Sequence, residues 1–150
     1  MPTINASDEV YNKNNVNKIT NDVALSGASF GTSYANIDTT YMKADLPEKG
    51  TYMVYVNATF LSVGSQVCYV RLYNNTLSAE VPKSFRYAVK NDGAPGGYAT
   101  EVAAGLLWQV TVTGPTVMYL QGKCGSDTNA GLRANANVVG YEMGYFKVTI

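Results

Sequence analysis

Apolar and polar residues alternate along most of the chain from about Phe30 onward, and the alternation is clearest between Thr51 and Leu61. Successive side chains of a β-strand point to opposite faces, so this pattern predicts a long strand with one buried face. The predicted core face carries Tyr52, Val54, Val56, Ala58 and Phe60. The opposite face carries Met53, Tyr55, Asn57, Thr59 and Leu61.

Shorter runs of the same kind predict strands at residues 34–41, 66–73, 84–89, 98–103, 106–113, 116–124, 138–143 and 145–150. Pro and Gly place a turn at residues 43–50, and Gly114 and Pro115 predict a hairpin between 106–113 and 116–124. We expect Phe85, Tyr87 and Val89 to share one face of their strand. Since no helix of ordinary length is evident, residues 29–150 are predicted to form an all-β, antiparallel β-sandwich.

Residues 1–28 differ from the rest because they are rich in Asn and sparse in apolar side chains. Such a segment cannot bury enough surface to fold alone, so we expect an extended N-terminal arm. Its apolar residues are predicted to dock on a neighbouring subunit or on another surface of a larger assembly. The docking residues are Ile4, Val10, Val16, Ile19 and Val23. The spacing of the last three leaves open a short helix or a three-stranded coil.

The low and balanced charge of the chain limits the kinds of partner it can bind. Only 15% of the residues are charged, and 11 basic residues balance 11 acidic ones. Because nucleic-acid surfaces need clustered Lys and Arg, we expect no nucleic-acid partner. No apolar run is long enough to span a bilayer, so we expect no membrane insertion. The start of the chain carries no basic segment leading into an apolar one, and we therefore expect synthesis in a host cytoplasm.

The sequence contains no His, so neither a Ser-His-Asp nor a Cys-His nucleophile can be assembled. No motif pairs two acidic residues across a cleft, and no phosphate-binding glycine loop occurs. We therefore expect no enzyme activity, no cofactor and no metal. Cys68 and Cys124 lie in apolar, strand-like segments. They are expected to be free thiols, with a disulfide between them as the less favoured alternative.

Two segments resemble a known superfamily. Residues 42–55 combine Pro47 with Gly50 and Tyr52 ahead of a long strand, and residues 144–150 form an apolar run at the end of the sequence. Both resemble the tumour-necrosis-factor and complement-globular-head families, and the same arrangement recurs in bacteriophage capsid decoration, head-fibre and tail-fibre tip domains. The resemblance covers about residues 30–150. It implies a jelly roll that assembles as a homotrimer. Without a collagen-like stalk or a membrane anchor in the sequence, the viral members are the better match.

The 12 Tyr and 4 Phe are more aromatic residues than one small core needs, so part of them is expected at a trimer axis. The axis candidates are Met53, Tyr55, Leu61, Tyr119, Tyr145 and Phe146. The alternative is that most of the Tyr residues are ordinary, half-buried strand positions.

Together these patterns predict a trimeric virion structural protein, either a capsid decoration or a head-fibre protein. It would lie on the virion surface and attach through its arm to the major capsid or tail protein. One alternative is a receptor-binding tail-fibre tip, with Tyr98 and Asn129 in loops 91–99 and 125–137 contacting a host receptor or glycan. A secreted cytokine-like ligand or lectin is another, and a small hydrolase is the least favoured.

Overall fold

The computed structural model describes residues 30–63, 66–91, 99–125, 130–133 and 141–148, and every regular element in them is a strand. The ten strands are β1 (Ala35–Asn36), β2 (Lys43–Leu46), β3 (Gly50–Val63), β4 (Gln66–Asn74), β5 (Ala79–Glu80), β6 (Arg86–Asn91), β7 (Ala99–Val112), β8 (Thr116–Cys124), β9 (Ala130–Arg133) and β10 (Glu142–Val148). The predicted all-β class is therefore confirmed. None of the described segments is a helix long and apolar enough to cross a membrane.

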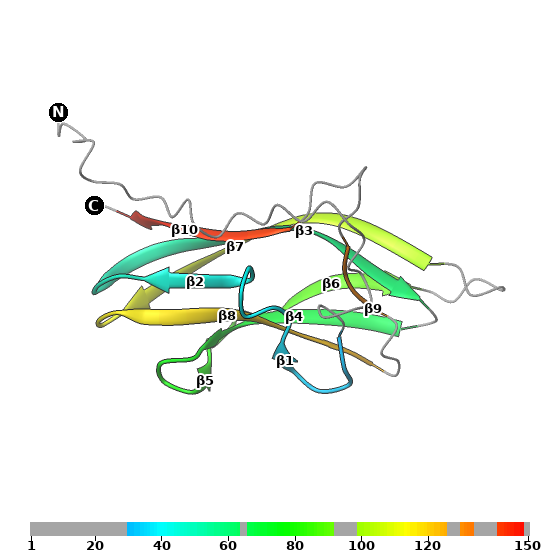
Figure 1. Ribbon diagram of the computed structural model, residues 1–150, viewed down its shortest axis with the longest axis horizontal. Helices are drawn as coiled ribbons and strands as arrows, with labels where there is room; N and C mark the ends of the chain where they lie inside the picture. Colours follow the sequence, from blue (N-terminus) through cyan, green and yellow to red (C-terminus); the bar gives the residue numbers. More distant parts are fainter. Residues whose placement is uncertain (1–29, 64–65, 92–98, 126–129, 134–140, 149–150) are drawn as a thin grey trace, which may run out of the picture.

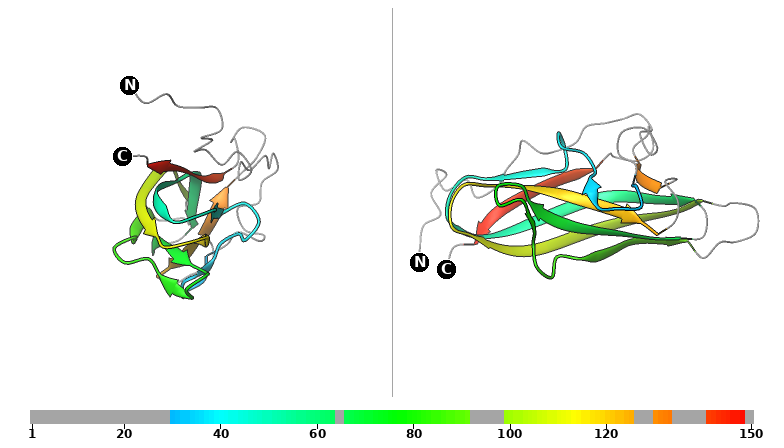
Figure 2. Two further views of the ribbon diagram at one scale, coloured as in Figure 1. Left: turned by 90° about the vertical axis from the view of Figure 1, so that its left-hand side faces the viewer. Right: turned by 90° about the horizontal axis from the view of Figure 1, so that it is seen from below.

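The strands form two antiparallel sheets that lie face to face (Figure 1). In the four-stranded sheet, β3 pairs with β10 on one side and with β7 on the other, and β9 also pairs with β3. In the six-stranded sheet, β8 pairs with β1, β2 and β4, and β4 pairs with β5 and β6. Seen end-on, both sheets curve around a common interior (Figure 2).

Consecutive strands mostly belong to opposite sheets. The chain crosses from one sheet to the other between β2 and β3, β3 and β4, β6 and β7, β7 and β8, and β8 and β9. The resulting orders, β2-β8-β4-β6 and β10-β3-β7, are those of a jelly-roll sandwich. The predicted hairpin between residues 106–113 and 116–124 is wrong for this reason: β7 and β8 are joined by a tight turn but pair with different strands.

The core lies between the two sheets. All five residues predicted for the core face of residues 51–61 are buried. They share one core cluster with Trp108, which lies beside Val54 in the same sheet, and with Leu72 of β4 in the facing sheet. Gly122 of β8 provides room for Phe30, because a Cβ there would lie 2.9 Å from a carbon of the Phe30 ring. The period-two pattern thus identified the buried face of the central strand correctly.

Residues 34–50 depart from the prediction. The expected strand at 34–41 is reduced to β1 because Asp38 begins a turn, in which its Oδ1 accepts the backbone N–H groups of Thr40 and Tyr41 at 2.8 and 3.0 Å. The expected turn at 43–50 begins with the strand β2, whose Ala44 and Leu46 are buried against the core. Asp38 therefore ends the first segment earlier than alternation alone indicates. Residues 98–103 and 106–113, predicted as two strands, both contribute to β7.

A β-bulge separates Tyr87 from Val89. The pairing of β4 with β6 shifts between Cys68 and Tyr69, so that Tyr69 lies opposite Tyr87 while Cys68 lies opposite Val89. One extra residue in a strand reverses the faces of the residues beyond it. The expectation that Val89 shares a face with Phe85 and Tyr87 is wrong, since Val89 is 3% exposed and the two aromatic residues are solvent-exposed.

Cys68 and Cys124 form a disulfide, so the expectation of two free thiols is wrong. They lie directly opposite each other on β4 and β8, with their Cα atoms 4.2 Å apart. Both cysteines were predicted to lie in apolar, strand-like segments, but alternation does not predict the register between two strands whose cysteines are 56 residues apart. The bond ties together the two central strands of the six-stranded sheet.

Candidate functional site

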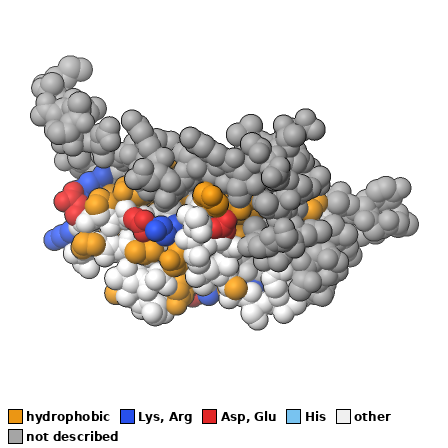
Figure 3. Space-filling view, viewed as in Figure 1, with side chains coloured by type: hydrophobic (Ala, Val, Ile, Leu, Met, Phe, Trp, Pro, Cys, Tyr) orange, Lys and Arg blue, Asp and Glu red, His pale blue; other side chains and the backbone are white. Residues whose placement is uncertain are grey.

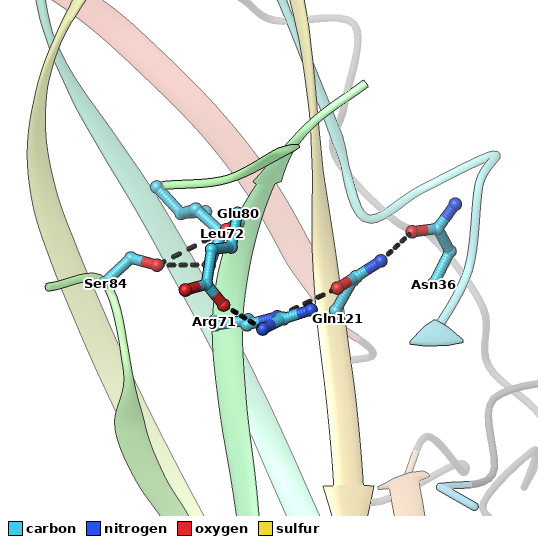
Figure 4. Close-up of polar contacts among 6 residues, drawn as sticks. All are labelled: Asn36, Arg71, Leu72, Glu80, Ser84 and Gln121. Atoms are coloured by element: carbon cyan, nitrogen blue, oxygen red, sulfur yellow. Dashed lines mark hydrogen bonds and ion pairs between the residues drawn. The ribbon is translucent and has the colours of Figure 1, made fainter. Parts of the chain in front are cut away.

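A rigid turn at residues 81–85 positions the most exposed aromatic side chains. Val81 N–H donates to the Leu72 carbonyl oxygen at 3.0 Å, and Ser84 N–H closes the turn on the Val81 oxygen at 3.2 Å. The buried Ser84 hydroxyl hydrogen-bonds the backbone of Leu72, accepting its N–H at 3.0 Å (Figure 4). From the other sheet, Trp108 Nε1–H donates to the Ser84 oxygen at 2.7 Å. The next residue, Phe85, is thereby held in one place.

Three rings gather on the outer face of the six-stranded sheet, and we call Tyr69, Phe85 and Tyr87 the aromatic platform. Their ring centroids are 5.0 Å apart for Tyr69 and Phe85, 5.3 Å for Tyr69 and Tyr87, and 5.5 Å for Phe85 and Tyr87. Tilted and edge-to-face contacts at such distances are favourable. Phe85 is nevertheless 46% exposed and Tyr87 is 70% exposed. The platform therefore presents aromatic surface to solvent.

Beside the platform, polar side chains form a continuous chain across the strands of this sheet (Figure 4). Asn36 Oδ1 accepts from Gln121 Nε2 at 3.2 Å, and Gln121 Oε1 accepts from Arg71 Nε at 3.0 Å. The Arg71 guanidinium also makes an ion pair with Glu80. Each planar group is held by the next, so the four side chains are fixed before any ligand arrives.

Tyr34 lies against this chain, and two cations contact its ring. The Arg71 guanidinium is 4.0 Å from the centre of the Tyr34 ring, and the Lys123 ammonium is 4.9 Å from it. Burial raises the pKa of the Tyr34 hydroxyl, which therefore keeps its proton. This hydroxyl oxygen is buried and has no hydrogen-bond partner among the described residues. Since buried polar atoms are normally satisfied, the hydroxyl is available to a bound polar group.

A pocket of about 130 Å³ opens at this place, and we call it the polar pocket. Its lining residues are Tyr34, Arg71, Glu80, Val81, Lys83, Ser84 and Phe85. Phe85 belongs to both the pocket and the platform, so the two are adjacent. The volume is well below the roughly 300 Å³ at which pockets for drug-sized ligands begin. It suits one small polar substituent of a larger molecule.

Lys83 stands at the rim in an uncommon backbone conformation. Its φ is 60°, in the left-handed region, at the third position of the turn that begins at Val81 and has Pro82 in second place. Glycine ordinarily takes that position in turns that need a positive φ, because a side chain there is strained. Strain of this kind clusters at functional sites. Lys83 thus occupies a backbone conformation that favours glycine, which has no side chain.

The residues of the platform and the polar pocket were not among the sites predicted from the sequence. Alternation placed Phe85 and Tyr87 on one face of their strand but did not identify that face as solvent-exposed. Tyr34, Tyr69 and Arg71 lie on other strands or loops, and only strand register brings them alongside. The signal that was available is the density of Tyr among strand positions, which by itself does not say which rings meet.

The outer face of the four-stranded sheet has a different character. Phe146 of β10 lies opposite Met53 of β3, and Tyr55 of β3 lies between Gly144 of β10 and Leu107 of β7. Leu107 is 51% exposed and Phe146 is 40% exposed, while Met53 and Tyr55 are half-buried. We call Met53, Tyr55, Leu107 and Phe146 the apolar face. A Cβ on Gly144 would lie 2.6 Å from Cζ of Tyr55, so glycine there lets the Tyr55 ring lie against β10.

Polar pairs border the apolar face at both ends. At one end the hydroxyls of Thr51 and Thr111 are 2.9 Å apart, and at the other Asn57 Nδ2 donates to Glu142 Oε1 at 2.7 Å. An apolar centre with a hydrogen-bonded rim is the anatomy of protein–protein interfaces. In the space-filling view, hydrophobic side chains lie beside scattered basic and acidic groups on the described part of this side of the molecule (Figure 3).

The six trimer-axis candidates do not lie together. Met53, Tyr55 and Phe146 share the apolar face, but Leu61 is only 4% exposed and so offers no surface to a neighbouring copy. Tyr145 points inward, where its ring meets that of Tyr52 edge-to-face at 5.6 Å. Tyr119 lies on β8 in the other sheet. An axis along the four-stranded sheet therefore keeps three of the candidates and adds Leu107.

Other predicted sites lie outside the described residues. They are the docking-arm residues Ile4, Val10, Val16, Ile19 and Val23, and the loop residues Tyr98 and Asn129. Within the described ranges, no group of three His, Cys, Asp or Glu side chains is placed to hold a metal ion.

In comparisons with known proteins, no protein family and no curated protein matches the chain. Two solved structures that are similar to it are described as pentameric capsid proteins isolated from metagenomic phage sequences. One is 10% identical with a TM-score of 0.34, covering 99% of this chain and 83% of that one. The other is 10% identical with a TM-score of 0.33, covering 99% and 77%. Scores this low do not establish a shared fold, and we therefore turn to the chain's own surfaces for its function.

Proposed function

We propose that the chain is a non-enzymatic structural protein on the surface of a bacteriophage particle, where it assembles as a homotrimer. The observation that carries this proposal is the apolar face of the four-stranded sheet, with its exposed Leu107 and Phe146 and its polar rim. Contiguous apolar surface of this kind marks sites of protein association. The jelly-roll strand order supports the proposal because the resemblance to trimeric decoration and fibre domains implies that order.

In this proposal the arm at residues 1–28 attaches the trimer to the major capsid or tail protein. Three arms joined through one trimer would bind with avidity, because the second and third attachments become intramolecular. The protein would then act as a capsid decoration or head-fibre protein through buried area rather than chemistry. We infer assembly in the host cytoplasm and placement on the virion surface.

Mass in solution and association with particles test the proposal together. Light scattering on the full chain is expected to give three times the chain mass of 16.1 kDa. Co-sedimentation with phage particles is expected for the full chain and lost when residues 1–28 are deleted. A fivefold mass would overturn the trimer while keeping self-assembly. A single-chain mass with no particle association would overturn the whole proposal.

The disulfide favours a second candidate, a secreted cytokine-like ligand or lectin. Bonds such as Cys68–Cys124 persist in oxidising compartments and are rare where thiols are kept reduced. Alkylation of free thiols at the moment of cell lysis separates the two candidates. If the bond is already formed in protein recovered from the medium, and no particles carry the chain, the secreted ligand is favoured. Reduced protein inside cells that oxidises only on released particles favours the virion protein.

A further inference from the structure

The aromatic platform and the polar pocket lie on the opposite sheet from the apolar face. Three mutually contacting rings, with Tyr87 70% exposed, form a larger solvent-facing aromatic surface than solubility favours. The neighbouring pocket is small, and charged side chains (Arg71, Glu80 and Lys83) line it together with apolar ones. Its ligand must therefore offer one flat apolar face and one polar substituent.

We propose that the platform and the pocket together bind a carbohydrate that carries an acidic substituent. The sugar ring stacks on Phe85 and Tyr87, and its acidic group enters the polar pocket beside Arg71 and Lys83. None of its residues belongs to the loops predicted at 91–99 and 125–137, and the proposal does not depend on the mode of self-assembly.

Stacking is the first part of the argument. One face of a pyranose ring exposes C–H groups that carry partial positive charge, whereas the face of an aromatic ring is negative. The two surfaces therefore attract each other, and both lose contact with water. Phe85 and Tyr87 supply such faces at the edge of the pocket, and the turn anchored by Ser84 and Trp108 keeps them in place.

Hydrogen bonding is the second part. Sugar hydroxyls both donate and accept hydrogen bonds. They therefore pair well with amide, guanidinium and carboxylate groups that can form further hydrogen bonds. The chain of Asn36, Gln121, Arg71 and Glu80 supplies all three kinds of group in a fixed array. The Tyr34 hydroxyl, buried and unpartnered among the described residues, supplies a further donor in the pocket wall.

Charge is the third part, and it selects an acidic sugar. Arg71, Lys83 and Lys123 lie at or beside the pocket, against the single carboxylate of Glu80. Within the described part of the chain, neither Lys83 nor Lys123 makes an ion pair. The excess of positive charge complements a carboxylate or sulfate. It also gives a reason for a lysine in the strained conformation at position 83.

A single-stranded nucleic acid fits less well. Such ligands are held by a positively charged groove that follows the phosphates, with successive aromatic platforms for successive bases. The aromatic platform here adjoins a pocket of about 130 Å³, with the Glu80 carboxylate in its wall. These features suit one sugar unit and its substituent better than a polymer backbone.

Titration calorimetry with the full chain tests this proposal. The acidic probes are sialyllactose and trigalacturonate, lactose is the neutral counterpart of the first, and a short oligo(dT) represents nucleic acid. We expect at least one acidic probe to bind saturably, and lactose to bind at least about tenfold more weakly than sialyllactose. Tyr87→Ala and Lys83→Gly are each expected to lower the affinity for the acidic probe by at least about tenfold. Leu77→Ala, a change at another exposed apolar residue, is the matched control and should leave binding unchanged.

The proposal is overturned if neither acidic probe binds, or if Tyr87→Ala binds as well as the unchanged protein. Equal affinities for lactose and sialyllactose would overturn the claim that the site selects an acidic substituent. Tighter binding of oligo(dT) that needs the same two residues would make this a nucleic-acid site instead. Light scattering on Tyr87→Ala completes the test, because a fall in mass would make the platform an interface between copies. The proposal of a trimer through the apolar face is tested by the mass in solution, whereas the carbohydrate site is tested by calorimetry. A failure of one can therefore be told from a failure of the other.

Discussion

The two sheets of the sandwich share one core, yet their outer faces differ in what surrounds the exposed apolar side chains. On the four-stranded sheet, Leu107 and Phe146 lie in an apolar centre and the polar groups at its ends already bond to each other. On the six-stranded sheet, Tyr87 packs on Phe85, which borders a pocket lined by Arg71, Lys83 and Tyr34. The Tyr34 hydroxyl has no hydrogen-bond partner among the described residues. The first arrangement suits permanent burial against another chain. The second suits reversible binding of a ligand that remains partly hydrated.

The largest effect is expected from substitutions that disrupt association through the apolar face. Replacing both Leu107 and Phe146 by Glu places two charges where the proposal buries apolar side chains, and a buried unpaired charge is strongly unfavourable. We expect the mass measured by light scattering to fall from three chains to one. Leu77→Glu, at a 72% exposed position away from this face, is the control and should keep the trimer. An unchanged mass in the double variant would show that copies associate through some other surface.

The second prediction concerns the covalent link in the six-stranded sheet. The Cys68–Cys124 bond closes a loop over 56 residues, and loop entropy gives it about 4 kcal/mol of stabilisation. Replacing both cysteines by Ala should lower the free energy of unfolding in urea by about that amount, or somewhat less if the unfolded chain keeps structure. Reduced wild-type protein is the matched comparison. A loss below about 1 kcal/mol would mean that the bond adds little to stability.

A third, smaller effect tests the anchoring of the platform. Trp108→Phe keeps an aromatic ring in the core but removes the N–H that the Ser84 oxygen accepts at 2.7 Å. A buried acceptor left without its partner costs about 1–3 kcal/mol, and we expect unfolding in urea to show a loss in that range. Hydrogen exchange should become faster at Ser84 and Phe85, while the strands of the apolar face keep their protection. Unchanged exchange at both amides would contradict the role assigned to Trp108.

The smallest effect has the opposite sign. Lys83→Gly removes the strain of a side chain at a φ of 60°, and part of this gain is offset by the greater flexibility of glycine in the unfolded chain. The net expectation is a rise of about 0.5 kcal/mol in the free energy of unfolding. Together with weaker binding of acidic sugars, that rise would mean that the chain trades stability for function at this position. A destabilised variant would instead show that the Lys83 side chain makes a structural contact.

The sequence by itself determined the all-β class, the boundaries of β8 and the buried face of β3. These follow from alternation, which is a local property, because side-chain direction along a strand depends only on the parity of the residue number. The same logic assigned Met53 and Tyr55 to the face opposite the core.

Only the tertiary structure decided which strands pair, and with that it decided everything that joins distant residues. The crossing between β7 and β8, the Cys68–Cys124 bond and the bulge beside Tyr69 all depend on register between strands far apart in the sequence. The platform and its pocket have the same origin, since Tyr34, Arg71 and Phe85 become neighbours only after β4 takes its place in the sheet. Alternation predicts the face of the strand on which each side chain lies. The neighbours of that side chain depend on how the whole sandwich packs.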